Sequence, residues 1–215
     1  MAQTELGIEV PAGSDAFDPQ GDMVTLADSL RSRVIVPVPN VTARTALAAA
    51  IGWTPSAAEP LRVWRGDATP TPREEWYDGT RWHVAADLTL GYGRLTTTPT
   101  VAGTPSWTNL ASVTALTLGG PCLIRTHVVL GNGNSGAPRL GSFRVVMDGT
   151  ALTAPIGIDM YLDLISGNNT VPRAGGYTWD HQPAAGTHTW TLQGNGSAAG
   201  SVIAYQGELS VVERP

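Results

Sequence analysis

The stretch Thr187-His188-Thr189-Trp190-Thr191-Leu192 decides the fold, because threonine alternates along it with a larger ring or apolar side chain. A strand of this period places His188, Trp190 and Leu192 on one face and the threonines on the other. The same alternation recurs in four further segments of the C-terminal half, at 122–130, 142–147, 156–164 and 203–211. No segment of helical period separates them, so a mainly β chain is expected, with an antiparallel, jelly-roll-like β-sandwich over residues 109–215.

Glycine marks two features around this predicted sandwich. Gly207 lies in the last segment and predicts a β-bulge there, with one inward face formed by Ile203, Tyr205, Leu209 and Val211. Before the sandwich, residues 93–108 combine glycine, proline and three consecutive threonines. That composition is typical of a linker rather than of a packed strand.

A small α+β unit is predicted upstream, over residues 31–92. Its clearest part is Glu75-Trp76-Tyr77-Asp78-Gly79-Thr80-Arg81-Trp82-His83-Val84. Asp-Gly is a favoured two-residue hairpin turn, so this run predicts two strands that carry Trp76 and Trp82 on opposite arms. We expect the two indoles to pack over the core of the unit.

Local signals predict the rest of this unit. Asn40 is a suitable N-cap for a helix over 41–51, and Gly52 stands where glycine commonly ends a helix. Strands are expected at 34–38, where Pro37 requires an edge position, and at 61–65. These elements and the hairpin make a compact unit that precedes the linker.

Residues 1–30 have a different composition, with six acidic residues and no arginine. Proline and glycine interrupt the segment, which predicts an extended arm that only an outside partner would order. Asp22 is a candidate N-cap for a short helix that ends at Leu30, with Met23 and Leu26 on one face.

The composition excludes several classes of function. The chain has 215 residues, a net charge of −5, 14% charged residues and no lysine, so no clustered basic patch is available for nucleic acid. No apolar run approaches the length that inserts into a membrane, and the first residues lack the pattern of a secretory signal. Cys122 is the single cysteine, which excludes an intrachain disulfide and a multi-cysteine zinc site.

Three arrangements of polar residues suggest catalysis, but each has a simpler interpretation. Ser135 lies in a loop like that of chymotrypsin-like proteases, yet no aspartate occurs between Asp87 and Asp148 to orient a histidine base. His181 and His188 provide too few ligands for a metal. Two carboxylates on one strand face could act as a glycosidase pair or belong to a solvated face, namely Asp159 and Asp163. No enzymatic activity and no cofactor are therefore expected.

Aromatic side chains near loops are the candidate contact residues. Trp107, Tyr177 and Trp179 could stack on a sugar ring or pack against a partner protein. The alternative interpretation is that these rings close the end of the sandwich.

Several blocks of the chain resemble structural virion proteins of actinobacterial tailed bacteriophages, of the minor tail or fibre type. In the region from Gly7 to His83 the matching blocks are Asp22-Met23, 43–47, 60–65 and 76–82. Near the C-terminus, 185–192 and 209–213 resemble the last strands of phage fibre β-sandwich heads. The resemblance implies a non-enzymatic virion component, assembled in the bacterial cytoplasm.

The resemblance also implies partners. The N-terminal arm and small unit would anchor the protein to other virion proteins, with anchoring side chains Ile8, Val10, Phe17, Met23, Trp76 and Trp82. The sandwich would form a homotrimer and contact the host surface, including a cell-surface glycan, or a neighbouring subunit. A capsid head fibre or decoration protein remains an alternative, and so does a carbohydrate-binding module or glycan-processing enzyme.

Overall fold

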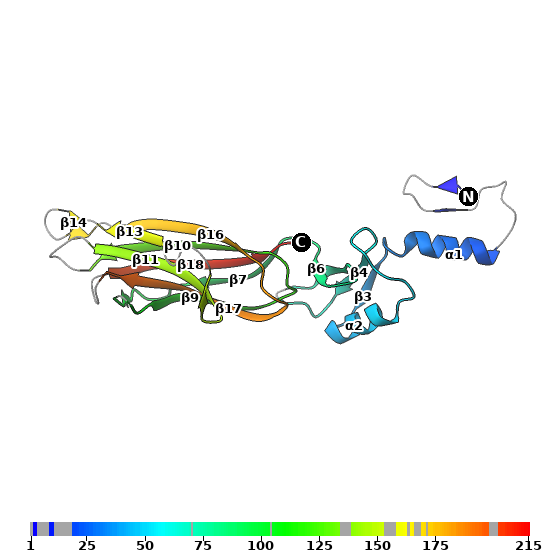
Figure 1. Cartoon of the computed structure of the whole chain (residues 1–215), viewed down its shortest axis with the longest axis horizontal. Coiled ribbons are helices and arrows are strands. Elements are labelled where there is room, and N and C mark those ends of the chain that lie inside the picture. The colour runs from blue at the N-terminus through cyan, green and yellow to red at the C-terminus, as the bar shows by residue number, and fades with distance from the viewer. Residues whose placement is uncertain are drawn as a thin grey trace. The chain divides into compact units, whose positions relative to one another are not determined.

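The computed structural model describes eleven stretches of the chain: 2–3, 9–10, 19–69, 71–103, 105–133, 139–152, 158–162, 164–165, 169–170, 172–197 and 202–215. The chain divides into two compact units, Met1–Ala85 and Ala86–Pro215 (Figure 1). Strands dominate the second unit, whereas the first combines helices and strands, which confirms the prediction of a mainly β protein with a small N-terminal α+β unit.

The first unit is built on a four-stranded sheet in the order β3-β4-β5-β6. Its strands are β3 (Ile35–Val38), β4 (Leu61–Arg65), β5 (Arg73–Tyr77) and β6 (Trp82–Val84). Helix α2 (Val41–Ala50) connects β3 to β4, which pair in parallel, whereas the other pairs are antiparallel. As predicted, Pro37 lies in the edge strand, where its missing N–H costs no ladder hydrogen bond.

Asn40 caps α2 as predicted, because its side chain accepts a hydrogen bond from the amide of Ala43 at 2.9 Å. The helix ends at Ala50, one residue before the predicted end, and its C-cap is Ile51, so Gly52 follows the cap as predicted. The backbone of Ile51 is extended, and its N–H still donates to the carbonyl of Leu47.

The first unit also contains α1 (Pro19–Leu30) and a pair of two-residue strands, β1 (Ala2–Gln3) and β2 (Glu9–Val10). Asp22 therefore lies inside α1 and is not its cap. Arg31 follows the helix directly, pairs with Glu59 at 3.0 Å and lies 5.4 Å from the ring centre of Trp53.

The second unit begins before the predicted sandwich boundary. Strands β7 (Leu88–Arg94) and β8 (Thr100–Val101) both pair with β18 (Val202–Glu213), so most of the predicted linker at 93–108 belongs to the sandwich. The linker prediction fails because strand pairing with a segment more than 100 residues away gives no local signal in the glycine-rich sequence.

Two antiparallel sheets form this unit. The first has the order β16-β10-β18-β7 and includes β10 (Cys122–Asn132) and β16 (Arg173–His181). The second has the order β12-β11-β17-β9, with β13 paired to β11, and contains β9 (Thr108–Thr117), β11 (Arg139–Met147), β12 (Thr150–Ala151), β13 (Ile158–Leu162) and β17 (Gly186–Gly196). A small separate pair joins β14 (Leu164–Ile165) to β15 (Asn169–Thr170).

The two sheets share one hydrophobic core. Its largest fully buried side chains include Trp190, Leu192, Phe143 and Ile124. Trp190 and Leu192 are the alternating residues of the stretch that predicted the strand, and both have no exposed surface.

The predicted bulge is present in β18 but lies at Tyr205 rather than at Gly207. Val129 and Leu130 of β10 pair with Gln206 and Ala204, so Tyr205 is the extra residue. The bulge reverses the face of the preceding residues. Val202 and Ala204 are therefore buried. The prediction that Ile203 and Tyr205 form the inward face is wrong.

Candidate functional site

The sheet of the first unit has two chemically different faces. Helix α2 covers the face that carries Leu61 and Val63, where they form a small core with side chains of the helix. On that same face the carboxylate of Glu75 has no exposed surface. Three arginines surround this carboxylate, namely Arg44, Arg65 and Arg73.

This buried cluster is held by direct hydrogen bonds. The Nε atoms of Arg65 and Arg73 donate to Oε1 of Glu75 at 3.0 and 2.9 Å, and Arg44 donates to Oε2. The Arg44 guanidinium also lies 4.5 Å from the ring centre of Trp82. Removing Glu75 would leave buried guanidinium groups without their carboxylate, so the cluster fixes α2 against the sheet.

The opposite face of the sheet carries two cross-strand rows of side chains. One row contains Ile35, Arg62, Trp76 and His83, and the next contains Pro37, Trp64 and Glu74. Trp64 is 47% exposed and Ile35 is 41% exposed. Among the described residues of this unit, no element covers these apolar side chains.

Trp76 is held in place by its neighbour on β6. The indole stacks on the imidazole of His83 with ring centres 3.9 Å apart and planes 6° from parallel. Nε2 of the buried His83 lies 2.8 Å from Oδ2 of Asp78. Burial raises the pKa of the Asp78 carboxyl, but hydrogen bonds from Thr80, Arg81 and His83 outweigh it and leave the pKa well below its ordinary value.

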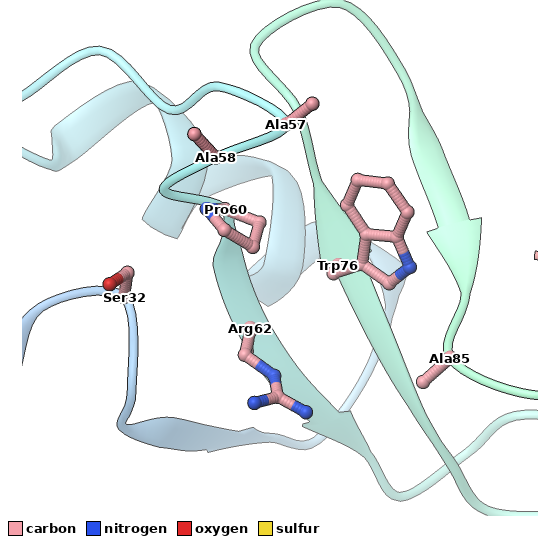
Figure 2. A pocket seen from close by; sticks show the side chains of 7 residues that line it. All are labelled: Ser32, Ala57, Ala58, Pro60, Arg62, Trp76 and Ala85. Atoms are coloured by element: carbon pink, nitrogen blue, oxygen red, sulfur yellow. The ribbon is translucent and has the colours of Figure 1, made fainter. Parts of the chain in front are cut away.

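A pocket of about 360 Å³ opens beside Trp76 on this uncovered face (Figure 2). The indole of Trp76 and the guanidinium of Arg62 line it from the neighbouring strands β5 and β4, and the ring of Pro60 lines it just before β4. The remaining walls are small side chains, namely Ser32, Ala57, Ala58 and Ala85. Arg62 Nε donates to Oε1 of Glu74 at 2.7 Å, so an ion pair lies next to the aromatic wall.

The three aromatic contact candidates of the sandwich have different environments. Tyr177 is 45% exposed on β16, and its ring lies edge-on to Trp179, 4.8 Å away. Trp179 is only 5% exposed and belongs to the core, so its predicted access to a ligand is wrong. The ring of Trp107 is half-buried and lies 4.1 Å from the guanidinium carbon of Arg144, which stacks over it.

The anchoring candidates are also separated. Trp82 is half-buried and packs against the small core beneath α2, whereas Trp76 is half-buried at the pocket. Met23 is 71% exposed on α1. Val10 lies in β2, and Ile8 and Phe17 lie outside the described residues.

The catalytic alternatives gain no geometry from the structure. Ser135 and Asp163 lie outside the described residues, and Asp159 lies in β13. Across the described stretches, no three of His, Cys, Asp and Glu are grouped so that they could hold a metal ion. Among these residues no helix is both long and apolar enough to cross a membrane.

Sequence reasoning missed two polar pairs. His188 Nδ1 on β17 lies 2.7 Å from Oδ2 of Asp148, which is in the turn between β11 and β12. The other pair joins Arg62, which lines the pocket, to Glu74. If residues 61–65 are paired with 73–77 as antiparallel strands, Arg62 and Glu74 become diagonal neighbours on the same face of the sheet. That pairing is the sequence signal that indicates this ion pair.

Comparison with known proteins gives little further information. The sequence matches no protein-family model and no curated protein. Dimeric latent PorU from Porphyromonas gingivalis is structurally similar over 60% of this chain and 13% of its own, with a TM-score of 0.39 and 12% identity. The structure of infectious bursal disease virus, Gx strain, is similar over 60% of this chain and 31% of its own, with a TM-score of 0.33 and 13% identity. This chain thus spans less than a third of either protein, and at these scores neither similarity bears on its function.

Proposed function

We propose that this chain is a non-enzymatic structural component of a phage virion, of the minor tail or fibre type. The N-terminal arm and α1 attach it to neighbouring virion proteins, and the sandwich makes contacts with other subunits or with the host surface. The blocks that resemble actinobacterial phage proteins suggest this class, and the exposed side chains of α1 carry the argument for attachment.

Helix α1 presents apolar surface that its own unit does not bury. Met23 and Val24 are adjacent and are 71% and 56% exposed. The preceding residues are acidic and interrupted by proline and glycine, so they add no core of their own. Apolar side chains at such exposure favour a partner that covers them, and a neighbouring virion protein is the proposed partner.

The sandwich has features that favour self-association. In the sheet orders of the described residues, β16 and β9 each pair on one side only, and they are nine and ten residues long. Long unpaired edges promote association with another chain. Tyr177 on β16 and Leu116 on β9 are exposed at these edges. A homotrimer is the proposed form, and the number three follows from the resemblance to trimeric phage fibres.

Particle incorporation tests the attachment. A chain that lacks residues 1–30 should fold but be absent from purified particles, and the double variant Met23→Ser, Val24→Ser should be strongly depleted. Ala27→Ser, at another exposed position on α1, is the matched control and should assemble normally. Normal incorporation of the deletion variant would refute the proposed attachment.

Light scattering on the full chain tests the oligomer separately. Wild type should have the mass of three chains at micromolar concentration, and Tyr177→Lys on the edge strand should lower it. Tyr205→Lys, in the central strand β18, is the control that should keep the wild-type mass. A wild-type mass of one chain would refute self-association, and a mass of two would correct the symmetry.

A further inference from the structure

The pocket beside Trp76 has the chemistry of a ligand site, and the proposed attachment through the arm and α1 does not use it. It lies on the uncovered sheet face, and its charged group, Arg62, and its aromatic wall, Trp76, come from the adjacent strands β4 and β5 (Figure 2). We propose that this pocket binds one sugar ring of a neutral saccharide, stacked on Trp76 and hydrogen-bonded to Arg62 and Glu74. This inference does not depend on the virion role.

Trp76 supplies a rigid aromatic platform. His83 covers one face of the indole at 3.9 Å, and Asp78 in turn holds the imidazole at 2.8 Å. With one face covered, the indole lines the pocket with its remaining surface. The negative face of an aromatic ring attracts the weakly positive C–H groups of a pyranose, and a ring already held in place loses little entropy when it binds.

The ion pair beside this platform suits hydroxyl groups. Both Nε and Nη2 of Arg62 approach a single oxygen of Glu74, at 2.7 and 2.5 Å. A guanidinium has five N–H donors and a carboxylate has about four acceptor sites, so this geometry leaves hydrogen-bonding capacity on both partners. Two adjacent hydroxyls of a sugar, each both donor and acceptor, can use that capacity together.

Charge and size narrow the ligand class further. Arg62 and Glu74 balance each other, with side chains 39% and 20% exposed, so the pair favours neither an anion nor a cation. The pocket volume of about 360 Å³ is near the lower end of the range for small-molecule sites. Walls of alanine and serine leave room for one ring rather than for a long side chain.

A proline-rich peptide is the competing ligand, because such peptides also dock on tryptophan and proline. A polyproline segment offers carbonyl acceptors to Arg62, but it has no N–H or hydroxyl donor for Glu74, which it would desolvate without a new hydrogen bond. An unsatisfied polar group costs about 1–3 kcal/mol, or roughly fivefold to 150-fold in affinity. The ion pair therefore favours the saccharide.

Calorimetric titration of the full chain tests the proposal with three neutral probes: maltotetraose, chitotetraose and a neutral arabinogalactan oligosaccharide. At least one probe should bind wild type. Arg62→Ala and Trp76→Leu should each weaken that binding at least about tenfold, since the first removes hydrogen-bond donors and the second removes the aromatic platform. Tyr177→Ala removes an exposed ring of the sandwich and should leave the affinity unchanged.

A variant that fills the pocket distinguishes a loss of binding from misfolding of the protein. Ala57 is exposed and lines the pocket from a loop, so Ala57→Phe should fill the pocket and abolish binding while thermal unfolding stays as in wild type. The proposal is overturned if no probe binds wild type, if binding survives both Ala57→Phe and Arg62→Ala, or if only Tyr177→Ala weakens it. Binding of a decaproline peptide in place of all three sugars, with the same sensitivity to Ala57→Phe, would also overturn it.

Discussion

Each unit contains one Asp-Gly turn with a histidine partner, but the two turns are built differently. In the sandwich, Asp148 and Gly149 have φ angles of 50° and 83° and alone connect β11 to β12. This is the two-residue turn that an Asp-Gly pair favours. In the small unit, residues 78–81 form a four-residue loop, in which only Gly79 has positive φ.

The difference lies in what each aspartate binds. Oδ1 of Asp78 accepts hydrogen bonds from the amides of Thr80 and Arg81 at 2.7 and 2.8 Å, which closes the longer loop from within. Asp148 instead reaches the neighbouring strand β17, where it binds the amide of Thr189 and the ring of His188. The same dipeptide thus stabilises one turn locally and joins two strands in the other.

Replacing each turn glycine with alanine should give the largest difference in stability between the two turns. At Gly79 a Cβ would lie 2.4 Å from the carbonyl oxygen of Pro55, in addition to the strain of φ +91°, whereas nothing lies within 4 Å at Gly149. Backbone strain of this kind costs about 1–3 kcal/mol. Gly79→Ala should therefore make residues 31–85 sensitive to protease, and Gly149→Ala should destabilise the sandwich by less. Equal protease resistance of Gly79→Ala and wild type would contradict the role of the Pro55 contact.

Removing the aspartates should give a smaller contrast. Asp78→Ala leaves two loop amides and His83 without their acceptor, and a typical hydrogen bond contributes about 0.5–1.5 kcal/mol. Asp78→Asn keeps an acceptor for the amides and is the control. Asp148→Ala should lower the free energy of unfolding of the sandwich less, because its carboxylate is 48% exposed. Chemical denaturation monitored by tryptophan fluorescence measures both effects.

The smallest effect should be the pH dependence of the sandwich turn. The hydrogen bond to Asp148 raises the pKa of His188 above 6.5, so this stabilisation is complete below pH 6.5 and is lost as the pH rises through the higher folded pKa. Hydrogen bonds from His188 and Thr189 lower the pKa of Asp148. The stability that its carboxylate contributes is therefore lost as the pH falls through this lowered pKa. The melting temperature of wild type should therefore exceed that of His188→Gln most near pH 5.5, and less at pH 8.5. A constant difference over this range would show that the pair does not titrate as described.

Features encoded by neighbouring residues were predicted correctly from the sequence. Asn40 caps α2, Pro37 lies in an edge strand, and Trp190 and Leu192 point into the sandwich core. Each depends on a cap, a missing donor or a period that a few consecutive residues define.

Features that depend on distant residues were missed or misplaced. The bulge lies at Tyr205 rather than at Gly207, and the pairing of β7 with β18 could not be read from a stretch that resembles a linker. The pocket combines residues from positions 32 to 85, which only the folded sheet brings together. No short window of sequence contains it.

The position of β18 has a consequence for how the protein is made. This strand lies between β10 and β7 and also pairs with β8, and its buried Glu213 accepts hydrogen bonds from the amides of Leu118 and Gly120. During synthesis, residues 86–201 leave the ribosome before β18 does. Until β18 has emerged, β10 and β7 therefore lack the strand that lies between them. Contacts over such sequence distances close slowly. The sandwich therefore completes its fold only after Glu213 has emerged, and the exposed β strands need protection from aggregation until then.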